Sequence, residues 1–182
     1  MLYLADIAYK KEMQHTQKIV TTSLMMGLII VCTMFIRIPI PLTTGYVHLG
    51  DAMIYLGVLL LGWRYSAIAA AFGSTLGDLL SGFAMWAPWT FAVKGGMALI
   101  AGVILLYFSR NNRKPSLPNY LVAMVPAGIF MVVGYFIAEG VMYGNWIAPW
   151  IGVPWNIGQF IVGIVLALVI QKALGKTNML KG

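Results

Sequence analysis

The chain has 182 residues, of which 60% are hydrophobic and only 9% charged, whereas soluble domains contain about 45–50% apolar and about 25% charged residues. This composition excludes a soluble globular domain and indicates a membrane protein. No Gly-rich phosphate-binding sequence ending in Lys-Ser or Lys-Thr occurs, so an ATP-driven step would need a partner protein. The lone Cys32 and the two histidines, His15 and His48, are too few for an internal disulfide or a His-based metal site. We expect no cofactor.

Residues 1–17 mix apolar and charged positions and lack the cleavage site of a signal peptide. We expect this segment at the inner membrane surface, and a native start at Met13 is an alternative. A membrane-spanning helix needs about 20 apolar residues. The sequence therefore predicts an all-α bundle of six transmembrane helices within 18–174, followed by a tail at 175–182. The six apolar segments cover 18–36, 49–63, 65–82, 91–109, 119–143 and 155–173.

The positive charges predict the orientation of the bundle. With the N-terminus inside, ten of the twelve Lys and Arg residues fall on the inner side, while Arg37 lies in an outer loop and Lys94 within the fourth segment. Short inner loops of membrane proteins are rich in Lys and Arg, so both termini are expected in the cytoplasm. The net charge of +7 is then explained by topology and by contact with the anionic inner leaflet, and nucleic acid is not expected as a partner.

Six polar or ionisable residues within the segments fall in the outer half of the predicted bundle. They are Asp51, Asp78, Lys94, Glu139, Asn156 and Gln159. Such residues are costly in a membrane and usually face the bundle interior, so they predict a polar pocket that opens to the outside above an apolar floor. The alternative is that Asp78 and Lys94 form an ion pair while Glu139 reaches the interface.

The outer connections 37–48 and 144–154 combine Pro with bulky apolar residues, which predicts ordered lids rather than flexible linkers. Five of the six Trp residues lie in outer regions. For any single Trp the better interpretation is an aromatic belt at the lipid interface, but the imbalance favours a role for some in the pocket. We expect walls or a lid from Tyr46, His48, Trp89 and Trp150, and a small planar heterocycle as ligand.

Three motifs, in this order, resemble the substrate-binding S components of energy-coupling factor (ECF) transporters. They are HLGDA at 48–52, GSTLGDLLSG at 73–82 and APWTFAVKGG at 87–96. The similarity is greatest to the branch assigned to hydroxymethylpyrimidine or pyridoxine-like vitamins. The resemblance implies a six-helix subunit of the prokaryotic plasma membrane with its ligand site near the extracellular face. It also implies two kinds of partner, a membrane T component and a pair of cytoplasmic ATPases.

Small residues on the first helix of such proteins contact the T component, and the matching positions here are Ser23 and Gly27. Asp78, Lys94, Glu139 and Asn156 are the residues that we expect to contribute most to ligand binding. The sequence leaves open which vitamin is bound.

Two other functions are weighed against this one. A stand-alone carrier or channel would normally show an internal repeat or polar residues at the membrane midplane, and we find neither. A membrane enzyme could use Asp51, Asp78 and Glu139 as acid and base, but no nucleophile motif accompanies them. We therefore expect that the chain itself is not an enzyme.

Overall fold

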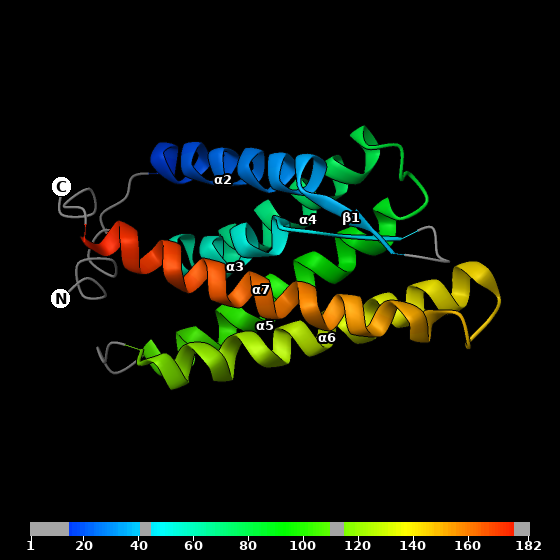
Figure 1. Ribbon diagram of the computed structural model, residues 1–182. Coiled ribbons are helices and arrows are strands. Elements are labelled where there is room, and N and C mark those ends of the chain that lie inside the picture. Colours follow the sequence, from blue (N-terminus) through cyan, green and yellow to red (C-terminus); the bar gives the residue numbers. More distant parts are fainter. Residues whose placement is uncertain (1–14, 41–44, 110–114, 177–182) are drawn as a thin grey trace.

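A computed structural model describes residues 15–40, 45–109 and 115–176. These residues form six helices and a two-stranded ribbon (Figure 1). In chain order the elements are α2 (His15–Phe35), β1 (Arg37–Pro39), β2 (Tyr46–His48), α3 (Gly50–Leu61), α4 (Trp63–Leu80), α5 (Ala87–Ser109), α6 (Leu117–Tyr143) and α7 (Pro149–Lys176). Most of the predicted segment 1–17 and of the tail 175–182 therefore lies outside the described residues.

Each of the six predicted apolar segments coincides with one of these helices. Four helices, α2, α5, α6 and α7, are long and apolar enough to cross a membrane. Helix α3 has 12 residues and extends only about 18 Å at 1.5 Å per residue, less than the roughly 30 Å hydrocarbon core of a bilayer. The start of α2 and the end of α7 lie at the same end of the bundle, and the ribbon lies toward the other (Figure 1).

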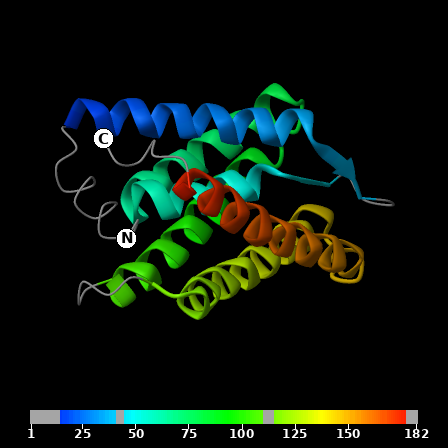
Figure 2. The ribbon, with the colours of Figure 1, turned by 60° about the vertical axis from the view of Figure 1, so that its left-hand side comes forward.

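Helix α3 is the central helix of the bundle. It packs against α2, α4, α5 and α7, and α2 and α6 lie on opposite sides of the molecule in both views (Figures 1 and 2). The hydroxyl of the fully buried Tyr55 donates a hydrogen bond to the carbonyl oxygen of Met124 at 2.9 Å. This bond satisfies the one polar group that Tyr55 brings into the core and joins α3 to α6.

Two glycines determine how α3 packs against its neighbours. A Cβ atom on Gly163 of α7 would lie 3.0 Å from the Cβ of Asp51, so the backbone of α7 passes directly against the beginning of α3. Between α3 and α4, Gly62 has a φ of 77°, which residues with a Cβ rarely adopt. The chain thus turns sharply at one residue, and α3 and α4 pack side by side.

The sequence predicts an all-α bundle, but among the described residues the ribbon is β structure. Its antiparallel strands pair Arg37 with His48 and Pro39 with Tyr46, and the backbone N–H of Ile40 donates to the carbonyl oxygen of Gly45 at 3.0 Å. The described part of the predicted lid at 37–48 is therefore ordered.

The predicted connection 144–154 is partly helical instead, because α7 begins at Pro149. Proline is favoured at the first position of a helix, since its missing N–H would have no partner there and its φ already suits a helix. Only the residues before Pro149 form a connection between α6 and α7.

Candidate ligand-binding site

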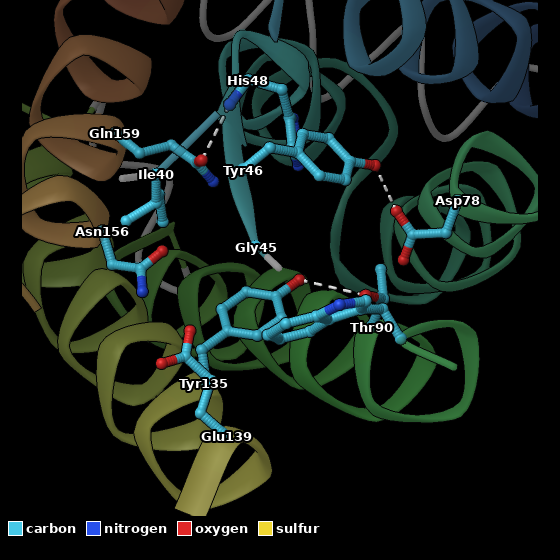
Figure 3. A pocket seen from close by; sticks show the side chains of 11 residues that line it. Ile40, Gly45, Tyr46, His48, Asp78, Thr90, Tyr135, Glu139, Asn156 and Gln159 are labelled. Carbon is cyan, nitrogen blue, oxygen red and sulfur yellow. Dashed lines mark hydrogen bonds between the residues drawn. The ribbon is translucent and has the colours of Figure 1, made fainter. Parts of the chain in front are cut away.

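A small polar cavity lies beside the ribbon, among α4, α5, α6 and α7 (Figure 3). Its volume is about 20 Å³, room for about one water molecule. The lining residues are Ile40, Gly45, Tyr46, His48, Asp78, Trp86, Thr90, Tyr135, Glu139, Asn156 and Gln159. Six of the predicted site residues are among them: Tyr46, His48, Asp78, Glu139, Asn156 and Gln159.

Tyr46 joins the ribbon to α4 across one side of this cavity. Its hydroxyl donates a hydrogen bond to Asp78 Oδ1 at 2.5 Å, and its ring lies 4.5 Å from that of Phe83, centroid to centroid. Burial, followed by the charge of Asp78, raises the pKa of Tyr46, so the hydroxyl keeps its proton. The other carboxylate oxygen of Asp78, Oδ2, is buried and has no hydrogen-bond partner among the described residues.

Trp86, Thr90 and Tyr135, which are not among the predicted site residues, form one wall of the cavity. The Trp86 and Tyr135 ring centroids lie 6.0 Å apart, and the hydroxyls of Thr90 and Tyr135 lie within hydrogen-bonding distance at 3.3 Å. Helical spacing could have indicated this wall, because residues four apart share a helix face. Tyr135 lies four residues before Glu139, and Trp86 lies four residues before Thr90.

Glu139 and Asn156 line the cavity from α6 and α7. Glu139 is only 2% exposed, and its Oε2 has no hydrogen-bond partner in the described part of the chain. A Cβ atom on Gly152 would lie 3.1 Å from Glu139 Oε1. Glycine at this position, one helical turn before Asn156, therefore leaves room for the carboxylate.

Asp51 and Lys94 form an ion pair instead of lining the cavity. Lys94 Nζ lies 2.5 Å from Asp51 Oδ1, and both side chains are fully buried. Gln159 Nε2 donates to Asp51 Oδ2 at 2.8 Å, while Gln159 Oε1 accepts the backbone N–H of His48 at 2.9 Å. This network joins α3, α5, α7 and the ribbon. The alternative pairing of Asp78 with Lys94 is wrong, because Lys94 is paired with Asp51 and Asp78 accepts a hydrogen bond from Tyr46.

His48 is held as a neutral side chain at the edge of this network. Its Nδ1 accepts the backbone N–H of Gly50 at 3.0 Å. Burial lowers the pKa of His48 to about 3, the nearby Lys94 adds to this effect, and Asp51 opposes it. The imidazole therefore contributes no positive charge to the site at neutral pH.

Trp89 and Trp150, two of the predicted site residues, are not among the residues that line this cavity. Trp89 is one residue from Thr90, about 100° around the helix, and is half-buried. Trp150 is 64% exposed, and its ring packs against Phe136 at 5.1 Å between centroids. The exposed Trp150 fits an aromatic residue at a lipid interface.

A larger hollow of about 340 Å³ lies on the far side of His48 and Gln159, between the ribbon and α7. The other residues that line it are Ile36, Ile38, Val47, Leu49, Trp155, Gly158 and Val162. It offers few polar groups to orient a ligand, and ligand sites normally combine apolar walls with several fixed polar groups. The smaller polar cavity is therefore the better candidate site.

Ser23 and Gly27, the predicted partner contacts, lie on α2 and outside the cavity. Ser23 is exposed, and a Cβ atom on Gly27 would meet nothing within 4 Å. Within the part of the chain that the structure describes, no group of three His, Cys, Asp or Glu residues could hold a metal ion.

A helical bundle with four helices long and apolar enough to cross a membrane, and with a polar cavity among its helices, defines a membrane protein with a candidate site for a small ligand. A sequence model of the family described as "ECF-type riboflavin transporter, S component" matches residues 13–176. The chain belongs to this family of ECF transporter S components and is a multi-pass protein of the cell membrane. The resemblance seen in the sequence is confirmed.

Individual proteins support the same assignment. The chain is 35% identical over 145 residues to the thiamine precursor transporter HmpT of Lactococcus lactis subsp. cremoris (strain MG1363), which covers 79% of each protein. It is 39% identical over 117 residues to an "uncharacterized protein in gap 3′ region" of Pyrococcus woesei, covering 63% of this chain and 72% of the relative. A solved S component of a bacterial ECF transporter matches with a TM-score of 0.73 and 21% identity, over 91% of this chain and 99% of that one. The last comparison supports the fold.

Proposed function

We propose that this S component captures a small vitamin precursor, hydroxymethylpyrimidine or pyridoxine, in the polar cavity beside the ribbon. It then delivers the ligand inward together with a membrane T component and two ATPases. The observation that carries the proposal is the enclosed cavity itself, in which Asp78 and Glu139 each keep one buried carboxylate oxygen unpaired. The similarity to a thiamine precursor transporter supports the same ligand class.

The size of the cavity favours a single ring over a larger vitamin such as riboflavin. Pockets for larger ligands usually enclose about 300–1,000 Å³, whereas this cavity encloses about 20 Å³ between side chains that already touch one another. A one-ring ligand requires fewer of these side chains to move. We place the ring between the Trp86–Tyr135 wall and the ribbon, within reach of Asp78, Glu139 and Asn156.

The orientation in the membrane follows from the same proposal. All six helices lie within the bilayer, the short α3 enclosed by its neighbours, with both termini in the cytoplasm and the cavity near the outer surface. The common end of α2 and α7 (Figure 1) supports an even number of crossings. The exposed Ser23 and the open space beside Gly27 support a contact of α2 with the T component.

A fluorescence titration of the purified protein tests the ligand. Trp86 lines the cavity and Trp150 does not, so the Trp86→Phe variant should lose the quenching that a bound ring produces, while the matched Trp150→Phe variant keeps it. The panel contains hydroxymethylpyrimidine, pyridoxine, thiamine, riboflavin and pantothenate. Saturable quenching by either of the first two supports the proposal, and no response from folded protein contradicts it.

Uptake in cells tests the partners. Cells that express this chain with a T component and ATPases should accumulate the ligand, and cells that lack those partners should not. Accumulation without them would favour the stand-alone carrier instead. A Gly27→Leu variant should bind the ligand normally and lose uptake, because the added side chain fills the open space on α2.

A further inference from the structure

Buried polar atoms without a partner mark what the cavity is built to receive. Six such side-chain atoms occur among the described residues, and three of them belong to residues that line the cavity: Asp78 Oδ2, Trp86 Nε1 and Glu139 Oε2. These side chains are 3%, 6% and 2% exposed, respectively. Leaving a buried donor or acceptor unpaired costs free energy, so a ligand that satisfies all three atoms removes that cost.

The three atoms define a hydrogen-bond pattern. An ionised carboxylate only accepts hydrogen bonds, and an indole N–H only donates them. In Figure 3, Asp78 and Glu139 approach the cavity from different sides, α4 and α6. The complementary ligand therefore carries hydrogen-bond donors at two separated positions and an acceptor that can meet Trp86.

The charged residues that line the cavity, Asp78 and Glu139, have the same sign. None of the lining residues is Lys or Arg. Lys94 is already balanced by Asp51 at 2.5 Å, and Arg37 lies over the rings of Tyr46 and Phe83 at 5.8 Å and 5.6 Å. An anionic ligand would meet two carboxylates with no free cation from the lining to offset them.

We infer that Asp78 and Glu139 select the ligand by charge and hydrogen-bond polarity. The site accepts neutral or cationic nitrogen heterocycles that carry hydrogen-bond donors, such as amino or hydroxyl groups, and rejects forms of the same ring that carry a phosphate or a carboxylate. This inference rests on the proposed function and deepens it. The ligand then enters as the free alcohol, so any reaction that phosphorylates its hydroxyl group follows import.

Three matched compounds test the inference on the full purified chain: 4-amino-5-hydroxymethyl-2-methylpyrimidine, its 4-oxo counterpart and its phosphate ester. The amino compound should bind at least about tenfold more tightly than the 4-oxo compound, which offers an acceptor where a donor is required. The phosphate ester should bind at least about a hundredfold more weakly than the alcohol, since its charge opposes both carboxylates.

The variants Asp78→Asn and Glu139→Gln each remove one charge with little change in shape. At least one should reduce the preference for the amino compound to below about threefold, because an amide can also donate to the 4-oxo group. Both should improve phosphate-ester binding relative to the alcohol by about tenfold. Glu12→Gln, which removes a charge outside the described residues, is the matched control and should change neither ratio. Unfolding temperature confirms that each variant is folded.

The outcomes separate the two proposals. Suppose that the wild-type chain binds the amino compound tightly, but that Asp78→Asn and Glu139→Gln change neither the amino-to-oxo nor the alcohol-to-ester affinity ratio. The inference is then overturned and the proposed function stands. Equal affinity of the wild-type chain for the ester and the alcohol would also overturn the inference and leave the proposed function standing. If neither the pyrimidines nor pyridoxine bind, the proposed function fails and the inference fails with it.

Discussion

Asp78 is shared between the ribbon and the space that a ligand would enter. Its Oδ1 accepts the hydrogen bond from Tyr46, and its Oδ2 is free of protein partners among the described residues. A ligand can therefore bind Oδ2 without breaking the hydrogen bond between Oδ1 and Tyr46. The same carboxylate would then contact both the ligand and the ribbon.

Replacing Asp78 should weaken ligand binding. Asp78→Ala removes both acceptors, and we expect the dissociation constant to rise by more than about tenfold, the loss typical of a charged hydrogen bond. Tyr46→Phe removes only the contact with the ribbon and should change affinity less. Titration calorimetry on both variants measures the difference, and wild-type affinity in Asp78→Ala would remove this residue from the site.

Lys94 belongs to the framework beneath the cavity. Lys94→Ala leaves the fully buried Asp51 without its ion-pair partner, and breaking such a pair from one side costs about 3–5 kcal/mol of stability. The double variant Asp51→Leu, Lys94→Met removes both charges and should recover much of that loss. Unfolding in detergent measures both. A single variant as stable as wild type would show that the pair does not stabilise the fold.

His48 should make the stability of the fold depend on pH. Its pKa is about 3 in the folded chain against an ordinary value of 6.5, so the unfolded chain binds the proton more readily and acid favours unfolding. The stability contribution is complete above pH 6.5 and decreases as the pH falls toward 3, by about 1.4 kcal/mol at pH 5.5. His48→Asn should unfold with a shallower pH dependence between pH 7.5 and 5.5. Parallel profiles for the two proteins would contradict the assignment.

At the scale of elements, glycines determine how closely the helices approach. A Cβ atom on Gly102 of α5 would lie 2.5 Å from the Cα atom of Trp63, at the beginning of α4. No side-chain movement relieves a clash with backbone, so the two helices would have to separate.

Gly102→Ala should therefore destabilise the bundle by about 1–3 kcal/mol, as overpacking usually does. Gly158 of α7 is the matched control, because a Cβ atom there meets nothing within 4 Å. Gly158→Ala should be neutral or slightly stabilising, since alanine favours a helix more than glycine does. The unfolding temperatures of the two variants, measured in the same detergent, test this prediction. Equal shifts in unfolding temperature would show that the contact at Gly102 is unimportant.

The helices could be predicted because each is a continuous apolar run, and the polar cluster because its members are rare in such runs. The ribbon could not be predicted, because its strands have only three residues each and one of them ends in Pro39. Such short strands have too little alternation of polar and apolar residues to distinguish them from a loop. The partner of Lys94 could not be predicted either, because Asp51 and Asp78 both lie at the same end of the bundle. Trp89 was predicted to line the site, whereas Trp86 lines the cavity. Which of the two faces the cavity depends on the residue at which α5 begins, and helix ends are poorly defined by sequence.

At the scale of the whole molecule, the ribbon lies toward one end of the bundle, while the start of α2 and the end of α7 lie toward the other (Figure 1). Ile147, in the connection between α6 and α7, is 80% exposed, and Lys172 is exposed near the end of α7. In the proposed orientation these two positions lie on opposite sides of the membrane.

Cysteine labelling should establish the orientation. In a Cys32→Ser background, Ile147→Cys should react with a membrane-impermeant thiol reagent in intact cells, and Lys172→Cys only after the cells are permeabilised. This result follows if the cavity faces outward and the termini face the cytoplasm. The reverse pattern would overturn the orientation, and labelling of both positions in intact cells would show that α7 does not cross the membrane between them.

The small volume of the cavity has a consequence for kinetics. A ring is larger than a space of about 20 Å³, so in the proposed function the side chains around the cavity have to move before the ligand enters or leaves, and the rate of that movement limits association and release. Affinity can then be high while association is slower than diffusion allows, because opening precedes each encounter that succeeds. If the proposed function holds, a long residence time follows, because release also has to wait for this movement.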